Sequence, residues 1–467
     1  MRQRSDNDGK LNNQYGLQQT VPASLATRKN ILILSLIFLT AFGVRFINWS
    51  SKQHEVAAVQ SSVVLNYKHQ AQLIHVYGPA SLYDASSPTS DPDLLGHPIG
   101  YPLLLSFIFS SGSDSSAQLL QILLDSLSAL IIALIACELF RVSVGVIAGM
   151  MAAFAPQFSW NSILLLPDTL AALPILLALL LLARLLKRPG ESSRRRLVSF
   201  ALAGILIGIS CWLRANALLL APFVALLIPL FCKRGKRLMP ALVLVGSALL
   251  VIAPLTIRNA VAFREFIPVS LGAGQTLIEG IADYDDGTLG LPQTDMELIR
   301  GEAETYQRPD YANSLFTPDG PARDRARVRR GLSVIRAHPF WFGSVMVRRA
   351  LSMLKLERTP LRLASANDSV FATPLRMIQR LFITAFFLPL SLIGASILIF
   401  RHQFRELAVL LVVPAYYFCT QSALHTEYRY VLVVHYFLFA LAAVAVYSVA
   451  CKVTGIIKSR AGASPPS

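Results

Sequence analysis

Three residues with acid–base side chains stand where apolar runs of the chain meet polar segments: His54, Glu55 and Asp168. Ionisable groups at the boundary between a bilayer and water are costly unless they are solvated or used, so we expect chemistry at this boundary. A carboxylate there could deprotonate or orient a hydroxyl group, because general-base catalysis uses an acid whose pKa the site can raise. We therefore take these three residues as the catalytic candidates.

Arginines occupy the same kind of position. Arg214, Arg258 and Arg429 each lie beside the end of an apolar run. A planar guanidinium matches phosphate geometry and stays charged, so these side chains could hold a lipid phosphate or diphosphate. The other candidates for binding a substrate at this boundary are His97, Tyr101, Asn259 and Tyr430.

The composition excludes a soluble globular protein. The 467 residues are 54% hydrophobic and only 15% charged, and the mean hydropathy is +0.52. The net charge of +16 is divided by apolar runs rather than gathered on one basic face, so nucleic acid is not an expected partner. The five cysteines lie in or beside apolar runs and form neither a disulfide framework nor a CxxC metal site.

The apolar runs predict an all-α polytopic membrane protein with about ten spans, because a hydrocarbon core takes about 20 helical residues. We expect spans near 31–48, 117–140, 143–157, 169–186, two within 197–232, 239–256, 379–400, 406–422 and 430–450. By this count, two basic loops, 187–196 and 233–237, fall on the same side of the membrane. Short loops rich in Lys and Arg are retained in the cytoplasm, so this side is the cytoplasmic one. This count places both termini in the cytoplasm and the candidate residues at the outer face of the plasma (bacterial inner) membrane.

The same reading divides the chain into five parts. They are a flexible cytoplasmic tail (1–30), a transmembrane catalytic module (31–256) whose first outer loop is 49–102, a large extracytoplasmic loop region (257–375), C-terminal transmembrane helices (376–451) and a second cytoplasmic tail (452–467).

Several local features within the polar segments carry expectations of their own. Residues 56–74 have the spacing of a helix that lies on the membrane, and Trp160 is expected at interfacial depth. The basic run 323–330 is expected to be solvated or to face lipid headgroups, and 337–349 to be an amphipathic surface helix. Residues 283–287 faintly resemble a calcium loop but lack most ligand positions, so we expect a turn.

Short motifs at the expected outer boundary resemble those of polytopic GT-C glycosyltransferases. The likeness is to the bacterial relatives of protein O-mannosyltransferases and lipid A aminoarabinose transferases. The motifs are His97-Pro-Ile-Gly-Tyr-Pro102, Leu166-Pro-Asp168, Leu213-Arg-Ala-Asn216, Ala253-Pro-Leu-Thr-Ile-Arg-Asn259 with Phe266-Ile-Pro-Val-Ser270, and Glu427-Tyr-Arg-Tyr430.

This resemblance implies inverting transfer of a sugar from a polyprenyl-phosphate-linked donor to a lipid, glycan or protein acceptor at the outer face. The first loop of such enzymes usually carries an Asp-Glu pair, whose Asp acts on the acceptor. The matching positions here are His54 and Glu55, so only Glu55 keeps the acid. The sequence names no cofactor and leaves a divalent metal open.

Simpler roles remain open for most of these residues. His54 and Glu55 could be solvated residues at a helix start, and Asp168 could be the N-cap of the following span. Arg214 and Arg258 could extend to the membrane interface, Tyr428 and Tyr430 could form an aromatic belt, and His97 could fix a turn before Pro98. The rival functions are a multi-pass transporter or lipid flippase, and a catalytically silent relative of the glycosyltransferases.

Overall fold

The computed structural model describes residues 28–58, 62–108, 114–357 and 371–461. Within these ranges the regular structure is entirely helical, which confirms the predicted all-α class. Seven helices are long and apolar enough to cross a membrane. They are α2 (Arg28–Ala58), α5 (Asp114–Leu139), α8 (Asp168–Lys187), α9 (Ser193–Leu213), α11 (Leu238–Phe263), α18 (Phe404–Thr420) and α19 (Leu432–Ala461).

The number of spans in the described residues is somewhat below the expected ten. An eighth span is formed if α16 (Ala372–Gln379) and α17 (Thr384–Phe400), which bend by 55°, are taken together. The other two expected spans coincide with shorter helical pieces. One is α6 (Val142–Phe154), and the other is broken into η5 (Ala215–Ala217), α10 (Leu220–Ala225) and η6 (Ile228–Leu230). Thirteen residues of α6 reach only about 20 Å of a core about 30 Å thick.

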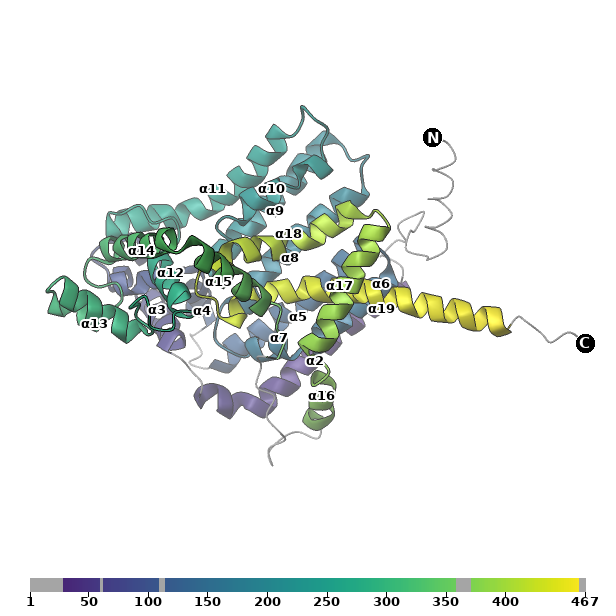
Figure 1. Ribbon diagram of the computed structural model, residues 1–467, viewed down its shortest axis with the longest axis horizontal. Coiled ribbons are helices and arrows are strands. Elements are labelled where there is room, and N and C mark those ends of the chain that lie inside the picture. Colours follow the sequence, from purple (N-terminus) through teal and green to yellow (C-terminus); the bar gives the residue numbers. More distant parts are fainter. Residues whose placement is uncertain (1–27, 59–61, 109–113, 358–370, 462–467) are drawn as a thin grey trace, which may run out of the picture.

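A polar cap, residues 264–357, lies at one end of the bundle with the first loop segment, residues 62–108 (Figure 1). The cap contains α12 (Ala273–Ala282), α13 (Asp295–Thr305), η7 (Pro309–Asn313), α14 (Gly320–Ala337) and α15 (Pro339–Ser352). The first loop segment contains α3 (Ser62–Tyr77), η1 (Pro79–Tyr83), η2 (Pro88–Ser90), η3 (Pro92–Gly96) and α4 (Gly100–Ile108). The last turns of α19 project at the opposite end of the bundle.

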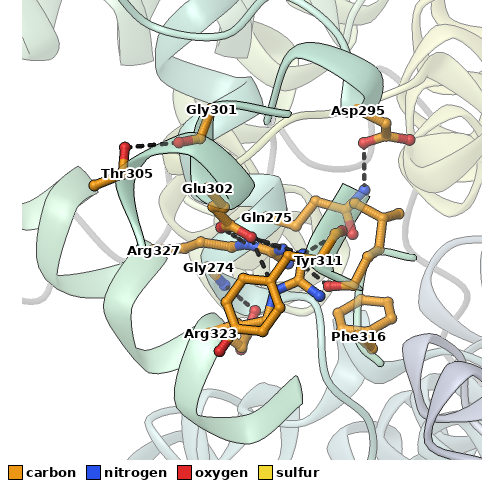
Figure 2. A network of polar contacts seen from close by, with 12 residues as sticks. Gly274, Gln275, Asp295, Gly301, Glu302, Thr305, Tyr311, Phe316, Arg323 and Arg327 are labelled. Carbon is orange, nitrogen blue, oxygen red and sulfur yellow. Dashed lines mark hydrogen bonds and ion pairs between the residues drawn. The ribbon is translucent and has the colours of Figure 1, made fainter. Parts of the chain in front are cut away.

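The basic run 323–330 is not simply a solvated or lipid-facing surface. Arg323 and Arg327, one turn apart on α14, are buried and both bind the carboxylate of Glu302 on α13 (Figure 2). Arg327 Nε donates to Glu302 Oε1 at 2.6 Å, and Arg323 Nε donates to Oε2 at 2.9 Å. The run therefore helps to hold the cap together, while Arg325 remains exposed.

Two expected membrane contacts are covered by protein. Val64 on α3 packs with Tyr101 and Leu166, so part of the apolar face expected to lie on the membrane is buried instead. Val56 belongs to the end of α2, and Val59 lies outside the described residues. Trp160, in α7 (Pro156–Asn161), is buried in a cluster with Val56 rather than exposed at the interface. The segment 283–287 does form a turn after α12.

An ion pair that the sequence analysis did not identify lies among the spans. Arg45 on α2 and Asp125 on α5 are fully buried, and Arg45 Nε donates to Asp125 Oδ2 at 2.5 Å. The Tyr436 hydroxyl on α19 donates to the other carboxylate oxygen at 3.1 Å. Charges within spans are rare because hydrocarbon solvates them poorly, so this pair links three helices at a fixed register.

Replacing Asp125 with Leu should strongly lower the stability of the bundle. The change leaves Arg45 buried without its counter-ion, which typically costs about 3–5 kcal/mol. The unfolding midpoint of the detergent-solubilised protein measures the effect. The double variant Arg45→Met/Asp125→Leu should recover much of the loss, whereas equal losses in the single and double variants would contradict a coupled pair.

Candidate active site

Three segments that are far apart in the sequence meet where α8 begins and α9 ends. Asp168 is the first residue of α8, and Arg214 directly follows α9. The two helices pack together and are joined by a short connection, so they run antiparallel and these two ends coincide. The short helix η9 (Tyr428–Val431) contacts α8 and brings Arg429 and Tyr430 to the same place.

An ion pair between Arg214 and Asp168 lies at the centre of this convergence. Arg214 Nε donates to Asp168 Oδ1 at 2.8 Å, and Nη2 donates to the same oxygen. The side chains are only 12% and 2% exposed. A carboxylate at one helix N-terminus and a guanidinium at the neighbouring C-terminus also complement both helix dipoles. The expected N-cap role of Asp168 is wrong, because Pro167 takes the N-cap position and no side chain caps the helix.

The ring of Tyr430 faces two guanidinium groups. The Cζ atom of Arg214 lies 4.2 Å from the ring centroid, and that of Arg429 lies 5.3 Å from it. Glu427 accepts hydrogen bonds from Arg429 Nη2 at 2.7 Å and from the Tyr430 hydroxyl at 3.2 Å. The buried Nε of Arg429 has no partner. The ring thus keeps two cations close together while one of their donors stays unused.

Aromatic rings of the first loop segment lie near the same cluster. The Tyr67 centroid is 5.0 Å from that of His97 and 5.1 Å from that of Tyr101. Burial raises the pKa of Tyr67, against the opposing effect of Arg214, and its buried hydroxyl has no partner. Burial, and then repulsion from the nearby arginines, lowers the pKa of His97 to about 3. At neutral pH the cluster therefore meets a protonated phenol and a neutral imidazole.

Gly100 explains how the first loop segment comes so close to Arg214. A Cβ atom at Gly100 would lie 2.3 Å from the backbone oxygen of Trp212, which is near the end of α9. Any other residue would push the start of α4 away from this helix end. The glycine of the His97–Pro102 motif is therefore required by packing, and it holds Tyr101 and His97 near the cluster.

Arg258 and Asn259 lie apart from the cluster and have a different set of partners. The helix α11 continues to Phe263, so both residues lie in its last turns and not at the start of a loop. Arg258 is 4% exposed and donates to the backbone oxygens of Leu82 at 3.3 Å and Thr89 at 3.0 Å. Asn259 Nδ2 donates to two backbone oxygens of the segment 267–269. Arg258 thus does not extend to the interface but holds the first loop segment against α11.

His54 and Glu55 lie in the last two turns of α2, and their side chains fall outside the described part of the chain. Two residues before His54, the ammonium group of Lys52 lies 4.7 Å from the ring centroid of Trp160. Trp160 belongs to the segment that leads into Asp168. The end of α2 is therefore next to the segment that precedes the cluster.

Comparisons with known proteins show which family model and which solved structures this chain resembles. Residues 96–257 match the family model described as dolichyl-phosphate-mannose-protein mannosyltransferase. The oligosaccharyltransferase AglB from Archaeoglobus fulgidus, solved with an inhibitory peptide and a dolichol-phosphate, aligns with a TM-score of 0.52 at 18% identity, covering 95% of this chain and 53% of AglB. Its apo form aligns with a TM-score of 0.52 at 16% identity, covering 93% and 52%.

The chain shares the fold of this archaeal oligosaccharyltransferase. It spans about half the length of the archaeal enzymes whose structures it matches. ArnT from Cupriavidus metallidurans, bound to undecaprenyl phosphate, aligns more loosely, with a TM-score of 0.39 at 14% identity over 92% of this chain and 79% of ArnT. No curated protein sequence matches significantly.

The fold also brings together residues whose contacts the sequence analysis did not predict. Tyr67 lies in a segment expected only to contact lipid, and its role could not be seen without knowing that α3 folds back onto α4. Asp283 lies in the turn after α12, and its Oδ2 is 2.9 Å from His425 Nδ1. This contact with Asp283 raises the pKa of His425. Arg349 also contacts Asp283, at 3.4 Å, so the polar cap is attached to the chain just before Glu427.

Among the described side chains, no three of the types His, Cys, Asp and Glu come together as metal ligands would. The buried Oδ2 of Asp168 has no partner. Together with Arg429 Nε and the Tyr67 hydroxyl, it leaves one acceptor and two donors available within one small region. Buried polar atoms are normally paired, so this open capacity marks the region as a place for a polar ligand.

Acid should destabilise the wild-type protein partly through His97. Its pKa falls from an ordinary 6.5 to about 3 in the folded state. The unfolded chain therefore binds more protons between these values, and stability decreases as the pH falls from 6.5 towards 3. His97→Gln should show a smaller decrease in unfolding midpoint over this range. The exposed His402→Gln serves as control, and an unchanged acid response in His97→Gln would show that His97 is not held neutral.

Proposed function

We propose that the protein is a membrane glycosyltransferase. It moves a hexosyl or pentosyl group from a polyprenyl-phosphate-linked donor to a lipid, glycan or protein acceptor at the outer face of the plasma (bacterial inner) membrane, with both termini cytoplasmic. The observation that carries this proposal is the convergence of Arg214 and Arg429 on the ring of Tyr430, next to the unpaired Nε of Arg429 and hydroxyl of Tyr67.

The donor phosphate has suitable partners in this cluster. Asp168 and Glu427 fix the orientations of Arg214 and Arg429 before a ligand arrives, so little side-chain entropy is lost on binding. The unused guanidinium donor of Arg429 and the protonated hydroxyl of Tyr67 can then donate to phosphate oxygens. AglB, which shares the fold, was solved with a dolichol-phosphate, and this supports a lipid phosphate as the ligand.

The reaction needs a base on one side of the sugar and charge stabilisation on the other. The acceptor oxygen attacks the anomeric carbon, and its proton passes to a base, for which we propose Glu55. The bond between that carbon and the phosphate oxygen breaks, and polyprenyl phosphate leaves with the electron pair. Arg214 and Arg429 stabilise the charge that develops on the leaving phosphate, an effect that often supplies the largest part of catalysis.

The structure offers less support for a transporter or flippase. Such a protein would use ionisable residues near the middle of the membrane along a pathway. The buried Arg45–Asp125 pair binds within the bundle, and both side chains are 0% exposed. Asp168 and Arg429, which keep buried polar atoms without a partner, lie instead at the start of α8 and in η9, just before α19.

Glu55→Gln should reduce transfer by at least a hundredfold, since a positioned base typically contributes about 10²–10⁴-fold. The assay uses protein in vesicles with polyprenyl-phosphate-linked hexoses and pentoses and a membrane extract as the source of acceptor. Donor binding should be unchanged, because the amide has the size of the carboxylate. Wild-type activity in this variant would remove Glu55 from the mechanism, and a catalytically silent protein would show no transfer in either form.

Arg429→Met should weaken the binding of a short-chain polyprenyl phosphate by on the order of tenfold, which corresponds to about 1.4 kcal/mol. Titration of the purified protein measures this without requiring the acceptor. Arg195→Met, at an exposed arginine in the first turn of α9, is the matched control. Arg258→Met should lower thermal stability more than binding, because Arg258 holds backbone oxygens. Equal binding by Arg429→Met and the control would exclude Arg429 from the phosphate site.

A further inference from the structure

The segment that leads into Asp168 is irregular yet buried. Residues 162–167 form turns and bends between α7 and α8, and Ser162, Ile163 and Leu165 are at most 2% exposed. The backbone oxygens of such a segment cannot reach water, so other groups of the protein must donate to them. Whatever supplies these donors also fixes the position of Asp168, which follows directly.

Two glutamines of α5 supply them. Gln118 and Gln121 lie one turn apart on the same face of the helix, and they are 5% and 2% exposed. Gln118 Nε2 donates to the Ile163 oxygen at 2.9 Å. Gln121 Nε2 donates to the Leu164 oxygen at 2.6 Å and to the Ser162 oxygen at 3.3 Å. Three consecutive backbone oxygens are thus bound by two side-chain amides.

The other end of each amide binds an aromatic donor. Gln118 Oε1 accepts from the indole N–H of Trp49 at 2.9 Å, and Gln121 Oε1 accepts from the hydroxyl of Tyr101. An indole nitrogen can only donate, so it fixes which end of the Gln118 amide is the oxygen. Each amide therefore bridges an aromatic residue on one element to the backbone of residues 162–164.

The two aromatic residues come from the elements that carry the other candidate residues. Trp49 lies on α2, just over one turn before His54 and Glu55. Tyr101 lies on α4 and belongs to the same motif as His97. The glutamine pair thus connects the end of α2, the start of α4 and the segment before Asp168, which are the three parts that must keep a fixed separation for acceptor and donor to meet.

We propose that Gln118 and Gln121 are positioning residues that set the distance between the acceptor base on α2 and the donor site at Asp168. Their effect on catalysis rests on the proposed transfer reaction, whereas their effect on the segment 162–168 does not. Reacting groups displaced by about 1 Å can lose about a hundredfold in rate, so the pair acts on turnover more than on donor affinity.

The variant Gln121→Glu tests the proposal, because only one of the two protonation states of the new carboxyl group can donate a hydrogen bond. A neutral carboxyl group keeps one O–H donor for the backbone oxygens of residues 162–164. A carboxylate has no donor and places negative charge against them. Burial favours the neutral form, so this switch should fall above the ordinary pKa of glutamate.

We expect the kcat of Gln121→Glu, relative to wild type at the same pH, to fall at least tenfold as the pH rises from 5.5 to 8.5, with donor KM nearly unchanged. Backbone amide exchange of residues 162–170, measured by mass spectrometry relative to wild type at each pH, should increase over the same range. Gln121→Met should show the faster exchange at every pH. Gln307→Glu, at an exposed glutamine of the polar cap, should match wild type throughout.

The two readouts separate the two proposals. Absence of transfer by the wild-type protein with every donor would contradict the proposed function, and the exchange measurement would still decide the role of the glutamines. The positioning role would be overturned if the amide exchange and the kcat of Gln121→Glu, each relative to wild type, stayed constant from pH 5.5 to 8.5. Loss of kcat in Gln121→Met without faster exchange in 162–170 would overturn it as well.

Discussion

The ion pair between Arg214 and Asp168 is the interaction on which the arrangement of the site depends. It joins the N-terminus of α8 to the C-terminus of α9, where the backbone dipoles of the two helices favour these same charges. Because the pair is largely shielded from water, neither charge could stay there without the other. The second guanidinium, Arg429, lies near the first, and both contact the ring of Tyr430 while Glu427 binds Arg429.

Tight packing around this pair explains several features that otherwise look unrelated. Gly100 allows α4 to approach the end of α9, and Arg258 binds the first loop segment at the backbone oxygens of Leu82 and Thr89. The polar cap is connected to the residues before Glu427 through Asp283 and His425. Each contact attaches a polar segment to a helix end, so the site is built by loops but fixed by helices.

Much of the helical framework followed from the sequence, because hydropathy and basic loops depend only on local composition. The break at Arg214 and the apolar runs were predicted correctly, and the resemblance to GT-C enzymes agrees with the fold. The N-cap role of Asp168 was not confirmed, because the neighbouring Pro167 takes the N-cap position. Its ion pair with Arg214 could not be predicted, because this partner is distant in the sequence.

Long-range pairing could not be predicted from one sequence. The buried state of Arg323 and Arg327 depends on Glu302, which lies more than 20 residues earlier, and nothing in the local pattern of α14 distinguishes them from the exposed Arg325. The same holds for Gln118 and Gln121, whose polar side chains in an apolar helix indicate that they have partners but not which ones. The expected span count is somewhat above that of the described residues because apolar composition does not show whether a helix is continuous.

The buried pair of Arg45 and Asp125 has a consequence for how the protein is made. The helix α2 is synthesised before α5, and alone in lipid it would carry an uncompensated guanidinium at a cost of a few kcal/mol by insertion scales. That charge is neutralised only after α5 has emerged from the ribosome, about 80 residues later in the chain. The insertion machinery must therefore shelter the first helix during this interval, and the two helices should leave it together.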